Sequence, residues 1–204
     1  MTDAHPNTRL ETFCDGVFAI ALTLLILDVK LPSPEGIAST AELWRALGHL
    51  APSVFAFLLS FTIILITWVN HHAALKLVAR SSASFIYANG FLLLSVVAIP
   101  FTASLLGSFL GTDHATPAVV LYDGVLAMTA IGWMLVTGAA LKDRLTTDVA
   151  AAATVRDSRR RAYPAFFLYS ALAVAALWFP LSSAAVTTVT WLFWLVLSIR
   201  LKHA

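Results

Sequence analysis

The stretch RLETFCDGVFAIALTLLILDVKLP, residues 9–32, decides how this chain folds. It is long and apolar enough to cross a membrane, because about 20 helical residues at 1.5 Å each span a hydrocarbon core of roughly 30 Å. It nevertheless carries an arginine, a glutamate and two aspartates. A charged group inside a span costs roughly 2.5–3.5 kcal/mol on insertion scales and is usually paired or functional. We therefore expect these charges to have partners at their own depth in the membrane.

The composition of the whole chain is that of a membrane protein. Of its 204 residues, 59% are hydrophobic and only 12% are charged, whereas about 25% of an ordinary soluble domain is charged. Apolar runs recur along the full length, so residues 1–204 are predicted to form one transmembrane domain. The net charge of +2 is too small to indicate a nucleic-acid partner, and the single cysteine, Cys14, excludes an intrachain disulfide. The opening MTDAHPNT lacks the basic start of a signal peptide.

Hydropathy and helix-breaking residues together predict an all-α fold with six membrane spans. The predicted spans cover residues 10–31, 52–71, 84–107, 117–141, 163–180 and 184–201. An even number places both termini on one side, and eleven of the thirteen basic residues fall in segments on that side. Because positively charged segments stay in the cytoplasm, both termini are predicted to be cytoplasmic.

Two polar connections stand out between the spans. Residues 32–51 form an outer connection in which Ser39 or Thr40 can cap a short amphipathic helix at the membrane interface, starting near Ala41. Residues 142–162 are predicted to be the longest inner loop, ending in a basic cluster. That cluster either attracts anionic membrane lipid or only enforces the orientation of the chain.

A helical projection gives the first span one wholly uncharged stripe, consisting of Phe13, Gly16, Val17, Ile20, Leu24, Leu27 and Leu31. Asp15 lies about 140° from Ile20 on the same projection, so it is expected to point toward neighbouring helices. Asp28, at the outer end, either contributes to an anionic ring at a pore mouth or pairs with Lys30.

Partners for Asp15 are predicted at the cytoplasmic ends of the next two spans. Trp68, His71 and His72 close the second span, and Asn89 lies near the start of the third. Together with Arg9 they supply donors for a network that anchors the base of the first helix. Alternatively, His71 and His72 are interfacial side chains with little role, and the pair alone supplies too few ligands for a fixed metal site. The sequence holds no phosphate-binding loop or catalytic triad pattern, so no cofactor and no enzyme activity are expected.

These residues resemble the bacterial members of the transmembrane protein 175 family of potassium channels. The family signature in the first helix is an arginine, three residues, then Phe-Ser-Asp; it reads Arg9, then Phe13, Cys14 and Asp15 here. The resemblance extends to WVNHH at 68–72 and NGFLLLSVVAIPFTASLLG at 89–107. The one departure is Cys14, which replaces the serine with a weaker hydrogen-bond donor of similar size.

The resemblance implies a homotetramer of six-helix subunits in the inner membrane of a bacterium, with the first helices lining a central pore. It implies a passive, potassium-favouring cation channel without a P-loop filter, and potassium as a transient ion in the pore rather than a cofactor. Apolar rings of Ile20, Leu24 and Leu27 would close the pore, with Thr23 as the hydroxyl position. The structural network would consist of Arg9, Phe13, Cys14, Asp15, Trp68, His71, His72 and Asn89.

Two other functions compete with a channel at this point. A secondary transporter or proton-coupled carrier would use Asp15, His71 and His72 as a relay, and a non-conducting scaffold would use none of them. Stoichiometry separates these readings, because a pore on the first-helix axis needs several subunits, whereas a carrier of this size works as a monomer or dimer.

Overall fold

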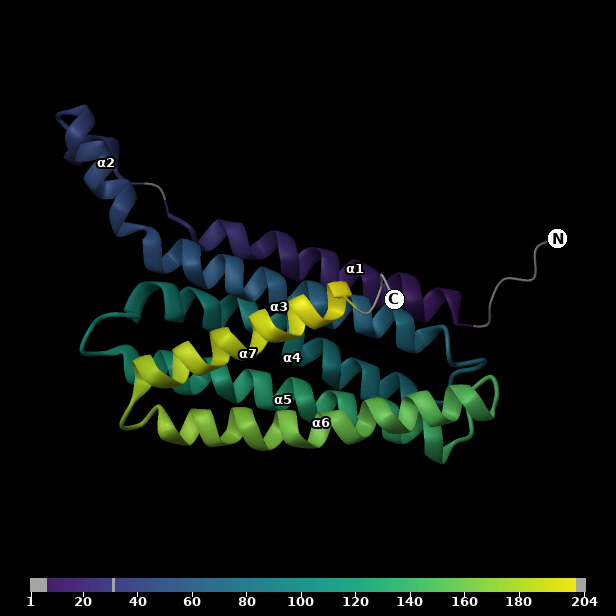
Figure 1. The fold of residues 1–204 in the computed structure, drawn as a ribbon. Coiled ribbons are helices and arrows are strands. Elements are labelled where there is room, and N and C mark those ends of the chain that lie inside the picture. Colours follow the sequence, from purple (N-terminus) through teal and green to yellow (C-terminus); the bar gives the residue numbers. More distant parts are fainter. Residues whose placement is uncertain (1–6, 31, 201–204) are drawn as a thin grey trace.

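The structure, a computed structural model, describes residues 7–30 and 32–200, and within these it is all-helical, as predicted. Seven α-helices follow one another in these described residues (Figure 1): α1 Thr8–Leu24, α2 Thr40–His49, α3 Ala51–Leu75, α4 Ala83–Phe109, α5 Ala115–Lys142, α6 Val149–Ala175 and α7 Pro180–Arg200. Two short 3-10 helices, η1 Leu25–Asp28 and η2 Pro34–Gly36, lie between α1 and α2.

Four helical segments of the described residues are long and apolar enough to cross a membrane, namely α1 with η1, α3, α4 and α5. The predicted spans at 52–71, 84–107 and 117–141 fall inside α3, α4 and α5. In α7 the apolar part is the shorter stretch Pro180–Val196.

The prediction of a long inner loop at 142–162 is wrong. The connection is confined to residues 143–148, and α6 begins at Val149, where the Asp148 carboxylate accepts a hydrogen bond from the Ala151 backbone N–H at 2.7 Å. The alanines that follow are the best helix formers, so the helix forms before the chain becomes apolar. The basic cluster and Pro164 therefore lie within α6, and this helix ends at Ala175 rather than at residue 180.

The first span also differs from its predicted bounds of 10–31. The α-helical part ends at Leu24, and η1 continues to Asp28 as a 3-10 helix. Because a 3-10 helix rises about 2.0 Å per residue instead of 1.5 Å, the last turn is narrower and longer than the α-helix assumed from the sequence. Leu31, the final member of the predicted stripe, lies outside the described residues.

The predicted capped helix in the outer connection is confirmed as α2. The Ser39 hydroxyl accepts a hydrogen bond from the Glu42 backbone N–H at 3.2 Å, and the Glu42 carboxylate accepts one from the Ala38 N–H at 2.6 Å. Figure 1 shows α2 projecting from one end of the bundle. It exposes Leu43, Trp44 and Leu47, which is the pattern of a helix that lies in a membrane interface.

The central helix of the bundle is α4, which packs against α1, α3 and α5. In Figure 1, α1 and α6 lie on opposite sides of the bundle, and α7 crosses in front; α7 packs against α3, α5 and α6. The helices α4 and α5 approach closely at Gly132, where an added Cβ would lie 2.9 Å from the Leu92 Cα atom.

One end of the bundle is closed by two paired loops. The Ala79 N–H donates to the Leu145 carbonyl at 2.8 Å, and the Thr147 N–H donates to the Leu77 carbonyl at 3.0 Å. The loop between α3 and α4 is thereby joined to the loop between α5 and α6. We call this end, with the start of α1, the basal end.

Candidate functional site

The first helix buries only one narrow face. Cys14, Phe18, Ala21 and Leu25 recur at helical spacing and are at most 1% exposed, and this face packs against α3 and α4. Van der Waals contact along this stripe determines which face of the helix points into the bundle.

Most of the predicted uncharged stripe lies on another face of α1 and is exposed in the single chain, although Val17 is half-buried against the core. Ile20 is 60% exposed, Leu24 40% and Leu27 72%. Thr23 is also exposed, and its hydroxyl donates to the Ile20 carbonyl at 2.9 Å. A continuous apolar face of this kind is covered by lipid or by another protein surface.

Asp15 is held by one of its predicted partners and not by another. The indole N–H of Trp68 donates to the Asp15 carboxylate at 2.8 Å, linking α1 to α3. Arg9 is exposed, and among residues 7–30 and 32–200 it forms no hydrogen bond or ion pair with Asp15. Phe13, a member of the uncharged stripe, is 61% exposed.

His71 and Asn89 form a separate, fully buried pair. The His71 Nε2 atom lies 2.7 Å from the Asn89 Oδ1 atom, and the Asn89 amide donates to the Phe85 carbonyl at 2.8 Å. The imidazole packs against the rings of Phe18 and Trp133, with centroid distances of 5.4 and 6.2 Å. The Asp15–Trp68 and His71–Asn89 hydrogen bonds are therefore separate contacts, where the sequence predicted one network.

His72 contacts Glu11, a residue that was not predicted from the sequence to take part in this network. Its Nδ1 atom lies 3.3 Å from the Glu11 carboxylate, and its ring stacks against Trp68 with a centroid distance of 5.9 Å. The signal was present, since Glu11 precedes Asp15 by four residues and so shares a helix face with it.

Asn7 was also missed, although it immediately precedes α1. Its side-chain amide donates to the Val78 carbonyl at 2.8 Å, and its carbonyl oxygen accepts a hydrogen bond from the Ser81 hydroxyl. Asn7 is 3% exposed. It ties the start of the first helix to the loop between α3 and α4.

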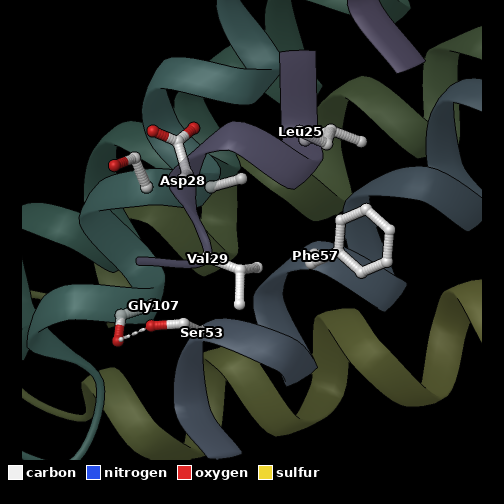
Figure 2. Close-up of a pocket in the computed structure, with 8 residues that line it drawn as sticks. Leu25, Asp28, Val29, Ser53, Phe57 and Gly107 are labelled. Carbon is white, nitrogen blue, oxygen red and sulfur yellow. Dashed lines mark hydrogen bonds between the residues drawn. The ribbon is translucent and has the colours of Figure 1, made fainter. Parts of the chain in front are cut away.

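The far end of α1 borders a small pocket, drawn in Figure 2. Asp28 and Val29 line it together with Ser53 and Phe57 of α3 and Gly107 of α4. The Ser53 hydroxyl donates to the Gly107 carbonyl at 3.3 Å. Asp28 forms no ion pair with Lys30 among the residues that the structure describes, so the pairing offered as one interpretation of Asp28 is not present there.

These features define a class: an all-helical membrane protein whose first helix is anchored on one side and has a free, uncharged face on the other. A family profile described as "Endosomal/lysosomal potassium channel TMEM175" matches residues 9–100. A protein of Chamaesiphon minutus named a potassium channel is 45% identical over 143 residues, covering 70% of each chain. One of Streptomyces collinus, also named a potassium channel, is 39% identical over 159 residues, covering 74% of this chain and 76% of its own.

The fold agrees with the sequence comparison. A crystal structure described as a lysosomal potassium-selective channel TMEM175 homolog from Chamaesiphon minutus superposes with a TM-score of 0.82 and 35% identity. The match covers 94% of this chain and 97% of that one. This chain belongs to the TMEM175 family, whose members among these relatives are ion channels and not enzymes.

Proposed function

We propose that this chain forms a passive, potassium-favouring cation channel in the inner membrane of a bacterium, as a homotetramer around a central pore. The observation that carries the proposal is the uncharged stripe of Ile20, Leu24 and Leu27, which is exposed in the single chain. Relatives that are 45% and 39% identical are named potassium channels. Four copies of the stripe around one axis make three apolar rings.

The rings close the pore without any charge. A branched apolar side chain offers no oxygen to replace the water around an ion, so a ring of four blocks the ion sterically and by dewetting. Ile20 and Leu24 are separated by about 6 Å along an α-helix. Leu27 lies in η1, so its ring is about 6 Å from that of Leu24, where an α-helix would give about 4.5 Å.

Thr23 supplies the oxygen for ion selection. It lies about 60° to one side of the stripe on the α-helical projection, so a modest rotation of α1 brings its hydroxyl toward the axis. The sequence contains no Thr-Val-Gly-Tyr-Gly run, so the channel works without a P-loop filter. Selection by single hydroxyl groups is weaker than selection by rings of backbone carbonyls.

The basal contacts hold α1 in position. Trp68 of α3 binds Asp15. The buried His71, hydrogen-bonded to Asn89, packs against the ring of Phe18. The charged residues at the start of α1 are thus tolerated because they anchor an apolar helix that has only one packed face.

The proposed topology has six spans with both termini in the cytoplasm. The four longer spans are joined by two more, namely the apolar second part of α6 and the stretch Pro180–Val196 of α7. The basal loops then face the cytoplasm. Reporters fused after residue 204 and inserted within 143–148 should both register as cytoplasmic, and a periplasmic signal from either one overturns this topology.

The function is tested by potassium flux from liposomes at matched protein amounts. We expect the purified protein to pass potassium faster than sodium, down a gradient and without a coupled ion. Leu27→Ala or Ile20→Asn should raise the basal flux, because each widens or wets a ring. Ile26→Ala is the matched control: this side chain is 52% exposed but lies on the far side of the helix from the stripe on the α-helical projection. If all of these variants conduct like the parent, α1 does not line the pore.

A second measurement separates a channel from a carrier. In a Cys14→Ser background, Ile20→Cys, Leu24→Cys and Leu27→Cys are expected to crosslink between subunits, because four stripes meet at one axis. A protein that stays monomeric or dimeric, never crosslinks at these positions and moves potassium only with a proton gradient is a carrier instead.

A further inference from the structure

We propose that Glu11, Asp15 and His72 form a binding site for a divalent transition-metal ion at the base of α1. Each of these residues offers one ligand atom, and the three atoms lie within 4.8 Å of one another. The two carboxylates come from α1 and the imidazole from α3, so a bound ion bridges the two helices.

The site is open to ions from the water but already partly ordered. The side chains of His72 and Glu11 are 37% and 31% exposed. The Nδ1 atom of His72 is itself shielded from solvent, forms no hydrogen bond among the described residues, and faces Glu11 at 3.3 Å. The His72 Nδ1 atom and the Glu11 carboxylate are therefore close enough to bind the same cation.

Trp68 fixes the geometry of the other two ligands. Its indole N–H donates to the Asp15 Oδ1 atom at 2.8 Å, which leaves Oδ2 to bind the ion. Its ring stacks against His72 at 5.9 Å, with an interplanar angle of 28°. Hydrogen bonds and packing of this kind orient metal ligands and raise the affinity of a site.

The ligand set selects the class of metal. One imidazole and two carboxylates suit Zn²⁺, Co²⁺ or Mn²⁺, whereas Mg²⁺ and Ca²⁺ prefer oxygen ligands alone. Zinc bonds of about 2.0–2.2 Å place tetrahedral ligands roughly 3.3–3.6 Å apart. The widest pair therefore closes by about 1 Å, which side-chain rotation supplies, and water takes the fourth position.

A metal bridge between α1 and α3 also restricts the first helix. This consequence rests on the proposed function: if opening requires α1 to rotate and expose Thr23, a bridge at its base holds the helix in place. Zinc on the basal side is then expected to lower potassium flux.

Binding is tested first, on untagged protein and without any flux measurement. Cobalt absorption and zinc-dependent thermal stabilisation are compared between the parent and Glu11→Gln, which keeps the size of the side chain and removes its charge. We expect the variant to bind at least about tenfold more weakly. The control is His49→Gln, which removes an imidazole at the end of α2 and should bind like the parent.

A second variant keeps the binding test decisive if Glu11→Gln fails to fold. Trp68→Phe keeps the stacked ring but removes the hydrogen bond to Asp15, and it should bind with an affinity between those of the parent and Glu11→Gln. Equal zinc affinity in all four proteins, or no binding by the parent up to 1 mM, overturns the site.

The flux assay separates the failure of this inference from that of the proposed function. Zinc on the basal side should inhibit the parent and His49→Gln at concentrations that leave Glu11→Gln active. If zinc binds at the site and flux is unchanged, the site does not restrain α1. If no variant conducts potassium at all, the channel proposal fails while the binding measurement stands.

Discussion

The helices α1 and α4 are equally apolar and both long enough to cross a membrane, yet they pack in different ways. Their most hydrophobic windows have the same mean hydropathy of 2.0. In α4, 56% of that window is buried inside the chain, whereas in α1 only 22% is buried. Hydropathy reports that a helix prefers to leave water, and it does not report what covers the helix afterwards.

The difference follows from what each helix offers its neighbours. The helix α4 is packed on several sides, with Leu92 against Gly132 of α5 and with Asn89 fully satisfied in the interior. In α1, Cys14, Phe18 and Ala21 are buried along one stripe, whereas Phe13, Ile20 and Leu24 are exposed in the single chain. A core helix is specified by close fit on every side, and a helix with a free face has surface left for assembly.

The largest expected effect is at the close contact between α4 and α5. In Gly132→Ala the new Cβ meets the Leu92 backbone at 2.9 Å, so the helices must separate, and overpacking of this kind costs about 1–3 kcal/mol. Thermal unfolding in detergent should shift down by several degrees. On the same helix, Gly124→Ala has nothing within 4 Å of the added atom and should unfold at the parent temperature. Equal shifts for the two variants would mean that close fit does not distinguish this contact.

The next effect concerns buried polar groups. Asn89→Ala removes the acceptor of the His71 imidazole N–H, and an unsatisfied buried donor costs about 1–3 kcal/mol. The matched change on α1 is Thr23→Val, at an exposed hydroxyl that bonds only within its own turn, so the free energy of unfolding should hardly change. The comparison between α1 and α4 breaks down if Thr23→Val proves as destabilising as Asn89→Ala when both are unfolded by denaturant.

The smallest expected effect is a pH dependence of stability at the basal end of α4. The Ser82 hydroxyl donates to the Asp143 carboxylate at 2.6 Å, and the Ser84 hydroxyl donates to the same oxygen. These hydrogen bonds lower the pKa of Asp143 below its usual value. Because the folded-state pKa is the lower one, the stabilisation is present above about pH 4, the usual value for aspartate, and is lost as the pH falls through the folded-state pKa.

The measurement is the unfolding temperature of Asp143→Asn relative to the parent across that range. The parent should be slightly more stable at neutral pH, and the difference should vanish in acid. Asp113→Asn, in the connection between α4 and α5, makes the same change of charge at another loop aspartate and provides the comparison variant. A constant difference at all pH values would show that the charge of Asp143 is not what the serines stabilise.

The sequence was sufficient for the all-α class, for the spans that became α3, α4 and α5, and for the capped helix at Ser39. The prediction from sequence failed where a helix begins outside the membrane, because hydropathy locates the apolar span and not the start of the helix. The alanine-rich start of α6 is polar enough to resemble a loop by hydropathy, but its high helix propensity and the Asp148 cap extend the helix well beyond the apolar residues.

At the candidate site, the membrane depth of the polar residues could be predicted from the sequence, but their hydrogen-bond partners could not. Placing Asp15, Trp68, His71 and Asn89 at one level required only topology. Which donor binds Asp15 depends on side-chain direction, and the rigid indole of Trp68 takes this place while Arg9 stays exposed. Glu11 was overlooked because it was counted as a flanking charge rather than as a neighbour of Asp15 on the same helix face.

The contact of Asn7 with Val78 and Ser81 has a consequence for the order of synthesis. The partners are 71 and 74 residues apart in the chain, so the first helix leaves the ribosome long before the loop that fastens it exists. During that interval α1 has neither its basal attachment nor most of the neighbours that pack against it. The helix proposed to rotate in the finished channel is thus also one that lacks its attachment during synthesis.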